Sequence, residues 1–511
     1  MEIVRIGSAE VLGVAIALLA ECCPCVAAGE AKIAPSDLPA VGTVDERFQS
    51  FNIEMVSVTG GPFWKPYARS GGAPKPEEQT QSAAHKNADL FAVRSPIDLA
   101  NLRLRKFASA LSPAYLRVSG TWANTTFFAR SDAGPTRPPD GYKSVLTRRQ
   151  WNGVIDFSKA IDAPIVTSFA ISSGTRDSKG GWKPDQAREI ISATRAAGGH
   201  LVAAEFMNEP DLPAIGGAPA GYGGAAFARD LQVFHAFMKQ AAPDIMVLGP
   251  GAIGSTPEDS ALFLASSARI DAVSYHYYGA LSERCAGARE PDFALSEEWL
   301  SGTDRAFAFY ASLRDRIVPG KPIWLTETAE AACGGDRWSA TFLDSFRYLD
   351  QLGRLARAGV QIVMHNTLIA SDYGLLDEVS LEPRPNYWAA LLWRQLMGTI
   401  VLDSRMPIQR GLHVYAHCQR HAPGAVVLLV INNDPQTSHE LVLPHSSERF
   451  TLDATALQDT AVRLNGVVLK TAGADPLPKL GGLPANPGSL RFAPTTITFL
   501  AIPDAGNRNC N

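Results

Sequence analysis

Two glutamates that end apolar runs are the residues of this sequence most suited to catalysis. Leu201–Pro210 reads LVAAEFMNEP, so an apolar run stops on Asn-Glu-Pro with Glu209 at its end. A proline removes a backbone donor and closes a strand. Pro322–Thr328 reads PIWLTET and ends an apolar run in the same way at Glu327. Glycoside hydrolysis needs two such carboxyl groups, one protonated to assist the leaving oxygen and one ionised to attack or stabilise the sugar cation.

Strict alternation of side chains along a strand indicates which residues accompany the two glutamates. On the first strand it groups Glu209 with Glu205, which then lies deeper on the same face and acts as a structural or pKa-tuning group. On the second strand it groups Glu327 with Ile323 and Leu325.

Polar side chains at other strand ends could complete a site. A Tyr278 hydroxyl beside Glu327 would hold that carboxylate ionised, and the His276 imidazole would bind a sugar hydroxyl. The alternative is that this His-Tyr-Tyr run only packs the top of the fold. A buried Arg117 needs a carboxylate partner, and either Glu327 or Glu205 could provide it.

These residues fall within a repeating pattern of short apolar runs separated by helical stretches. Helical periodicity marks Phe227–Ala242 and Phe342–Arg357. Eight strands with intervening helices predict an α/β fold, a (β/α)8 TIM barrel over residues 51–399, whose active site lies at the carboxyl ends of the strands. The expected strands are Phe51–Val56, Tyr115–Gly120, Pro164–Ile171, Leu201–Met207, Ile245–Gly249, Ala272–Tyr278, Pro322–Thr326 and Gln361–His365.

After residue 400 short β-like runs replace the helical pattern. An Asn465-Gly466 pair between two of them is a hairpin signal, and Pro476–Pro494 is a proline-rich excursion. We expect an antiparallel β-sandwich domain made of residues 29–50 and 400–511. Its expected strands are Leu412–His417, Ala425–Ile431, Glu440–Leu443, Arg449–Leu452, Val462–Leu464, Val467–Leu469 and Thr496–Ile502.

Composition narrows the functional classes. The hydrophobic content of 46% and charged content of 19% predict a globular chain. A net charge of −4 argues against a nucleic-acid partner. If the substrate is a polyanion, basic residues must therefore be concentrated in the cleft. We expect no cofactor and no metal, since the sequence has no P-loop, no dinucleotide-binding glycine motif and no zinc-ligand spacing.

The N-terminus predicts export. Val11–Ala20 has the length of a signal-peptide core, too short to span a bilayer, and small residues follow at positions 26–28. We expect cleavage of residues 1–28, a secreted or periplasmic protein, and no membrane span in the mature chain. Against this, the leader holds Glu2 and Glu10 and is not basic.

Four cysteines would remain after cleavage, an even number that suggests two disulfides. Three pairings are possible. We expect Cys285–Cys333, which both follow barrel strands, and Cys418–Cys510, which both belong to the β region. The alternative is buried free thiols.

Several stretches of residues 110–420 resemble the heparanase group of retaining β-glucuronidases, a family of (β/α)8 barrels with a β-sandwich. Cys510 is similar to the second sandwich cysteine of that family. The stretches that carry the resemblance are LSPAYLRVSGT (Leu111–Thr121), Asn208-Glu209-Pro210, HYY (His276–Tyr278), PGKPIWLTET (Pro319–Thr328), Gly334-Gly335, AGVQIVMHNTL (Ala358–Leu368), DYGLLDE (Asp372–Glu378), PNYWAALLW (Pro385–Trp393) and VYAHC (Val414–Cys418).

The resemblance implies a role for each matching residue. Glu209 is the acid/base, Glu327 the nucleophile and Asn208 the ligand of the sugar 2-hydroxyl. Residues that bind the sugar or its carboxylate are Thr121, Gly334, Asn366 and Tyr373, with Asn366 where the family often has Gln. Cys333 departs from the family pattern, which leaves the shape of the Gly334 loop open.

The function expected from the resemblance is retaining hydrolysis of β-D-glucuronosides, with a glucuronate-containing polysaccharide or a glucuronide as substrate. Endo action on heparan sulfate-type polysaccharide is the first expectation. Exo action on small or terminal glucuronides is the alternative, and a non-catalytic carbohydrate-binding protein is a remote one.

Overall fold

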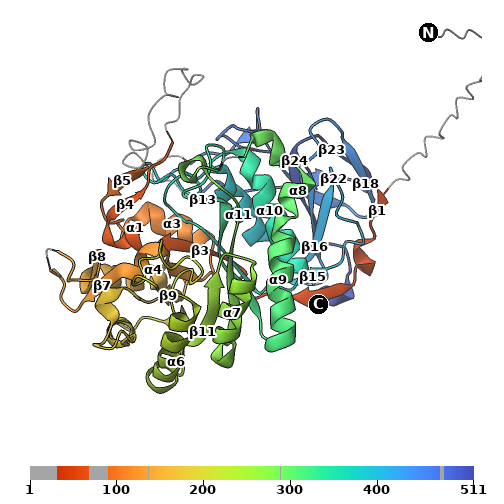
Figure 1. The fold of residues 1–511 in the computed structure, drawn as a ribbon. Coiled ribbons are helices and arrows are strands. Elements are labelled where there is room, and N and C mark those ends of the chain that lie inside the picture. Colours follow the sequence, from red (N-terminus) through yellow and green to blue (C-terminus); the bar gives the residue numbers. More distant parts are fainter. Residues whose placement is uncertain (1–30, 68–89, 136, 288, 472–476) are drawn as a thin grey trace, which may run out of the picture.

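A closed barrel of eight parallel strands forms the centre of the fold, as expected. The computed structural model describes residues 31–67, 90–135, 137–287, 289–471 and 477–511 (Figure 1). The expected leader, residues 1–28, lies outside the described residues. The barrel strands are β3 (Gln49–Glu54), β6 (Leu116–Ser119), β9 (Ile165–Ser168), β10 (Leu201–Glu205), β11 (Met246–Ala252), β12 (Ala272–Leu281), β13 (Ile323–Ala332) and β14 (Ile362–His365).

Apolar side chains close the amino-terminal end of the barrel. Six consecutive strands, β9 to β14, contribute to a separate buried cluster that includes Val166, Leu248 and Trp324. The Trp324 indole stacks on Tyr115, which precedes β6, with 5.2 Å between ring centroids. Because this end is filled, only the carboxyl end can admit a ligand.

Helices cover the outside of the barrel and bury its outward-facing apolar side chains. The resulting larger apolar cluster, here called the outer core, includes Leu116, Ile165, Ile323 and Leu325. The two helices expected from periodicity are α6 and α10. The main helices are α3 (Leu102–Ala110), α4 (Arg148–Ala160), α5 (Asp185–Ala196), α6 (Gly224–Ala241), α7 (Pro257–Ser266), α9 (Gly302–Ile317), α10 (Phe342–Arg357) and α11 (Pro385–Leu396), with the short α1 (Met55–Thr59) and α8 (Glu297–Leu300).

A β-sandwich packs against one side of the barrel. Its strand order is β2-β15-β16-β17-β24-β19-β20-β21, with β22 beside β19, and a three-stranded sheet β1-β18-β23 covers it. The bounds are β1 (Ala31–Lys32), β2 (Ala40–Thr43), β15 (Met397–Leu402), β16 (His413–Gln419), β17 (Val426–Asn432), β18 (His439–Leu443), β19 (Ser447–Asp453), β20 (Arg463–Leu464), β21 (Val467–Val468), β22 (Leu483–Ala485), β23 (Gly488–Phe492) and β24 (Thr496–Ile502).

The sandwich contains more strands than the sequence indicated. The region expected to be a proline-rich excursion holds β22 and β23, and β15 begins at Met397, before the expected boundary. Asn465 and Gly466 both have positive φ, 51° and 82°, which is the turn that an Asn-Gly hairpin requires. Both expected disulfides, Cys285–Cys333 and Cys418–Cys510, are present. No described helix is long and apolar enough to cross a bilayer.

Helix α10 lies between the barrel and the sandwich and is buried along almost its whole length. Its carboxylate Asp350 accepts hydrogen bonds from His413 Nδ1 and Tyr415 Oη on β16, both at 2.5 Å. Arg354 on the same helix lies 2.6 Å from the other oxygen of Asp350. His413 Nε2 also lies 3.0 Å from Glu297 on α8.

These contacts set the charge of His413. Burial alone would lower its pKa, but the neighbouring Asp350 and Glu297 outweigh that effect and raise the pKa to about 9. Asp350 shows the reverse balance, since His413 and Arg354 bring its pKa down to about 2 despite its burial. A buried ion pair therefore joins the barrel to the sandwich.

His413→Gln should lower the melting temperature and weaken its dependence on pH. Since the pKa of folded His413 is raised to about 9, its stabilisation is complete below pH 6.5 and is lost as pH rises towards 9. This shift corresponds to roughly 3 kcal/mol of unfolding free energy. Melting temperatures measured from pH 6 to 9.5 should therefore fall more steeply in the wild type. Parallel curves would contradict the assignment, and His200→Gln, at an exposed histidine, is the matched control.

Candidate active site

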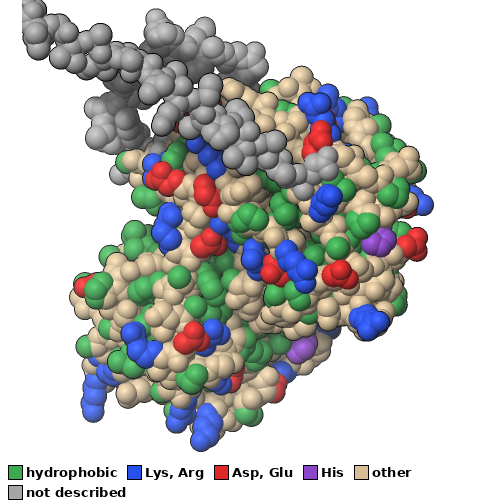
Figure 2. All heavy atoms as spheres, turned by 90° about the vertical axis from the view of Figure 1, so that its right-hand side faces the viewer, with side chains coloured by type: hydrophobic (Ala, Val, Ile, Leu, Met, Phe, Trp, Pro, Cys, Tyr) green, Lys and Arg blue, Asp and Glu red, His purple; other side chains and the backbone are tan. Residues whose placement is uncertain are grey.

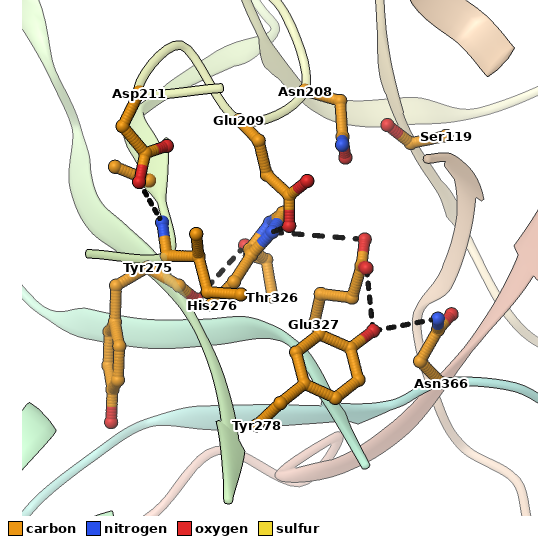
Figure 3. A network of polar contacts seen from close by, with 12 residues as sticks. Ser119, Asn208, Glu209, Asp211, Tyr275, His276, Tyr278, Thr326, Glu327 and Asn366 are labelled. Atoms are coloured by element: carbon orange, nitrogen blue, oxygen red, sulfur yellow. Dashed lines mark hydrogen bonds and ion pairs between the residues drawn. The ribbon is translucent and has the colours of Figure 1, made fainter. Parts of the chain in front are cut away.

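Glu209 and Glu327 come together at the carboxyl end of the barrel (Figure 3). One carboxylate oxygen of each residue and a ring nitrogen of His276 all lie within 4.8 Å of one another. Both glutamates are largely buried, with exposures of 9% for Glu209 and 6% for Glu327. The sequence thus located the pair correctly, from two strand ends 118 positions apart along the chain.

Glu209 lies in the loop that follows β10. The strand ends at Glu205, and Met207 turns away into the outer core instead of continuing on the Glu205 face as alternation predicted. Glu209 has a left-handed backbone, with φ of 48°, and its N–H donates to the Gly251 carbonyl at 3.2 Å. The carboxyl group therefore reaches the barrel mouth through a turn, because the strand has already ended.

A bulge in β13 positions Glu327. Leu325 pairs with Tyr275 and Glu327 pairs with the next residue, His276, so Thr326 is an extra residue in the ladder. A bulge re-aims the side chains that follow it.

The bulge makes strict alternation wrong for β13. Ile323 and Leu325 pack in the outer core, whereas Glu327 enters the barrel mouth. Thr326 Oγ1 points into the barrel as well and donates to Glu205 Oε1 at 2.8 Å. Two successive polar side chains therefore face the same interior.

Arg117 pairs with both carboxylates that the sequence offered as alternatives. Its Nη1 donates to Glu327 Oε2 at 2.7 Å and its Nη2 to Glu205 Oε2 at 2.9 Å. Nη2 also donates to Asn208 Oδ1 at 2.8 Å. The guanidinium is only 1% exposed, so this buried charge is fully paired within the site.

Arg117 and His276 together lower the pKa of Glu327. Burial alone would raise the pKa of Glu327, but His276 and Arg117 outweigh it, and the pKa lies below its usual value. Arg117 and His276 lower the pKa of Glu205 in the same way, although its complete burial alone would raise it. Tyr278 Oη donates to Glu327 Oε1 at 2.7 Å, as the sequence predicted.

His276 does not face the substrate space. It is fully buried, its Nδ1 lies 3.1 Å from Glu209 Oε1, and its Nε2 lies 3.2 Å from Arg117 Nη2. Burial lowers the pKa of His276, but Glu327 and Glu209 raise it more, so the net pKa is above the usual value. The expected contact with a sugar hydroxyl is therefore wrong, because the ring lies behind the two carboxylates.

Glu54 is a third carboxyl group that sequence reasoning missed. It ends β3, and Asn366 Nδ2 donates to its Oε1 at 3.1 Å. Burial, and then the charge of Glu327, raise its pKa well above the usual value. The signal was weak, since only Phe51 and Ile53, with Asn52 between them, precede Glu54, and the expected strand continued past it to Val56.

Glu54, Glu209 and Glu327 line a cavity of about 450 Å³. Of the predicted site residues, the cavity walls include Thr121, Glu209, Tyr278, Glu327, Asn366 and Tyr373. Among the described residues, the walls do not include Asn208, His276, Gly334, Arg117 or Glu205. Asn208 is nonetheless adjacent, since its amide oxygen is held by Arg117 and its backbone N–H by Asn124 Oδ1 at 2.9 Å.

The Gly334 loop has an unusual shape that follows from its disulfide. Cys333, bonded to Cys285, has φ of 60°, and Gly334 and Gly335 follow with φ of 87° and 84°. A Cβ on Gly334 would lie 2.6 Å from the Trp64 Cβ, so only glycine fits. Arg284 holds this loop by donating to the carbonyls of Cys333 and Gly335 at 3.1 and 2.6 Å.

The arrangement of Glu209, His276 and Glu327 is compact enough to hold a cation. We assign none, because the Arg117 guanidinium already supplies positive charge at 2.7 Å from Glu327. The site offers a carboxyl group with a raised pKa (Glu54), two carboxyl groups whose pKa values are lowered beside Arg117 (Glu205 and Glu327), and hydroxyl and amide groups around one small cavity.

Comparison with solved structures supports the fold. A 4-O-α-L-rhamnosyl-β-D-glucuronidase from Fusarium oxysporum superposes with a TM-score of 0.65, covering 92% of this chain and 99% of that one, at 14% identity. A family 51 α-L-arabinofuranosidase from Thermotoga petrophila gives a TM-score of 0.63 over 92% and 99% of the two chains, at 13% identity. At these identities the likeness concerns the fold alone.

Sequence relatives are more specific. Heparanase from Mus musculus is 28% identical over 484 residues, covering 81% of this chain and 88% of that protein. Baicalin-β-D-glucuronidase from Scutellaria baicalensis is 29% identical over 54% of each chain. The model of glycosyl hydrolase family 79, N-terminal domain, matches residues 85–353, which is more than half of the chain. The chain therefore belongs to glycosyl hydrolase family 79 and is a glycoside hydrolase.

Proposed function

We propose that this glycoside hydrolase is a retaining β-glucuronidase in which Glu209 is the acid/base and Glu327 the nucleophile. The observation that carries the proposal is the pair of carboxylates with oxygens within 4.8 Å of each other. Retaining glycosidases separate their carboxyl groups by about 5–5.5 Å, whereas inverting enzymes need about 6.5–9.5 Å to admit water. The glucuronide substrate class is extended from baicalin-β-D-glucuronidase of Scutellaria baicalensis, which is 29% identical over 54% of each chain.

The reaction follows two displacements. In the first, the glycosidic C–O bond breaks, Glu327 bonds to the anomeric carbon, and the leaving oxygen takes the proton of Glu209. In the second, water gives a proton to Glu209, its oxygen bonds to the anomeric carbon, and Glu327 leaves. Arg117, His276 and Tyr278 stabilise the negative charge of Glu327 before and after the covalent intermediate.

The cavity has groups suited to a glucuronate ring. We assign the Asn208 amide to the 2-hydroxyl, since Arg117 fixes its orientation beside Glu209. Thr121, Asn366 and Tyr373 provide hydroxyl and amide groups for the remaining oxygens. The left-handed Gly334-Gly335 turn follows Cys333 of the cavity wall, and we propose that its backbone N–H groups bind the sugar carboxylate without a cation.

Glu54 suits an anionic sugar because its pKa is raised. Burial and the charge of Glu327 favour the protonated form of this carboxyl group. A further ionised carboxylate next to Glu327 would repel the glucuronate, whereas a protonated one can both donate and accept hydrogen bonds at the sugar.

The cavity lining favours exo action over endo action on a heparan sulfate-type chain. A sulfated polysaccharide requires a row of basic side chains, and Lys143 is the one basic residue in the described cavity wall. We therefore propose a terminal glucuronate as substrate. We also propose export of the protein, which the two disulfides support.

Replacing Glu327 with Gln should abolish turnover while preserving the fold. The amide keeps hydrogen-bonding capacity towards Arg117 and Tyr278 but cannot attack the anomeric carbon. The measurement is hydrolysis of phenyl β-D-glucuronide, with circular dichroism as the fold control. For the wild type, proton NMR of the first product should show the β-anomer, and an initial α-anomer would contradict the retaining mechanism.

Glu209→Gln should slow hydrolysis of an alkyl β-glucuronide by roughly 10²–10⁴-fold, the usual contribution of a general acid. An activated nitrophenyl glucuronide needs no proton on its leaving oxygen, so its first step should be much less affected. Azide, which needs no general base, should then restore turnover and give β-glucuronyl azide. Equal losses on both substrates without rescue would assign Glu209 a structural role.

Tyr278→Phe should shift the acidic limb of kcat/KM towards higher pH. The Tyr278 hydrogen bond is one of the contacts that lower the pKa of Glu327, so its removal raises that pKa. Since the nucleophile must be ionised, activity is then lost at a higher pH as the solution is acidified. Phe127→Leu, away from the cavity wall, is the control, and an unchanged acidic limb would contradict the prediction.

The overall proposal is tested by mass spectrometry of products from three substrates: phenyl β-D-glucuronide, a glycan ending in glucuronate, and an internal heparan-type oligosaccharide. Free glucuronate from the first two supports the exo proposal. Internal fragments would establish endo action instead. Failure on all three, with folded protein, would leave the carbohydrate-binding alternative.

A further inference from the structure

The wall of the cavity beside Glu209 is apolar. Leu212 N–H donates to the Glu209 carbonyl at 3.0 Å, so the segment that follows the proposed acid stays next to it. Asp211 Oδ2 accepts from the N–H of Ile253 at 3.0 Å and ties the loop after β11 to the same segment. As a result Leu212, Ile215 and Ile253 all line the cavity on the side of the acid.

Apolar side chains are also exposed where the cavity opens. Three large hydrophobic side chains of the cavity wall are exposed to solvent: Ile215 at 70%, Leu281 at 51% and Phe91 at 37%. Phe91 stacks on Trp64, another wall residue, with 4.6 Å between ring centroids. Exposed apolar side chains that adjoin a site and have no cover are typical of ligand-binding surfaces.

The charged residues of the cavity wall do not favour binding of a polyanion. Besides Glu209, Glu327 and Glu54, the one charged residue in the described cavity wall is Lys143. Asp211 lies directly behind the apolar segment. Figure 2 looks onto the side of the molecule on which the β-sandwich lies, and basic and acidic side chains are interspersed on that face.

The general acid protonates the oxygen of the leaving group, so the surface beside Glu209 faces the aglycone. We propose that this surface, formed by Leu212, Ile215 and Ile253, selects an apolar, aromatic aglycone over a sulfated sugar. The inference rests on the proposed function and adds the class of leaving group. The cavity of about 450 Å³ is the size range of sites that enclose small, drug-sized molecules.

The test is a series of 4-alkylphenyl β-D-glucuronides from hydrogen to butyl. Alkyl length leaves the acidity of the phenol nearly constant, so differences report binding of the aglycone and not leaving-group chemistry. Wild-type kcat/KM should rise with each methylene, by up to about fourfold where the group is fully buried. Ile215→Ser and Ile253→Ser should flatten the series, while inhibition by free glucuronate, bound on the other side of Glu209, stays unchanged.

Leu264→Ser removes an exposed leucine on α7, outside the cavity wall, and should leave the series unaltered. A flat wild-type series, with phenyl glucuronide still hydrolysed, would overturn the aglycone proposal alone. Faster, salt-sensitive cleavage of a sulfated heparan-type oligosaccharide would overturn it as well. If no glucuronide is hydrolysed, the proposed function fails first and the aglycone proposal fails with it.

Discussion

The buried Arg117 guanidinium is the interaction on which the site depends. It contacts Glu205, Glu327 and Asn208 at once, in a part of the barrel that water does not reach. An unpaired arginine there would be strongly unfavourable, and so would the two carboxylates without it. Arg117 and the two carboxylates therefore fix one another, and the position of the Glu327 carboxylate follows from charge pairing as much as from the strand that carries it.

Around this centre, the protein controls which carboxyl groups carry charge. Arg117 and His276 lower the pKa values of Glu205 and Glu327. The pKa of Glu54 is raised instead, because burial and the charge of Glu327 outweigh the weaker effect of Arg117. A barrel mouth with several acids in a small space can thus hold an anionic sugar. The difference between neighbouring acids comes from how strongly each of them interacts with Arg117 and His276.

The sequence predicted the architecture well because the barrel strands are buried on both faces and read as apolar runs. It pointed to Glu209 and Glu327 because each lies within a few residues of the end of such a run. It failed where side-chain direction depends on neighbours. The Thr326 bulge separated Glu327 from Ile323 and Leu325, with which alternation had grouped it, and His276 lies behind the carboxylates. Glu54 was missed because the sequence does not show whether an acid next to apolar residues lies on the protein surface or in the barrel interior. The β22 and β23 strands were hidden by proline and glycine, which edge strands tolerate.

The pairing of β2 with β15 has a consequence for the order in which the chain can be built. Thr43 lies opposite Ile400, and the entire barrel is encoded between these two neighbours. During synthesis, β2 emerges first and has no partner until the last barrel strand and α11 have been made. Closing such a long loop late makes the sandwich sheet a high-contact-order element that completes after the barrel. Strand β2, near the start of the described chain, is thus among the last to pair with its neighbour.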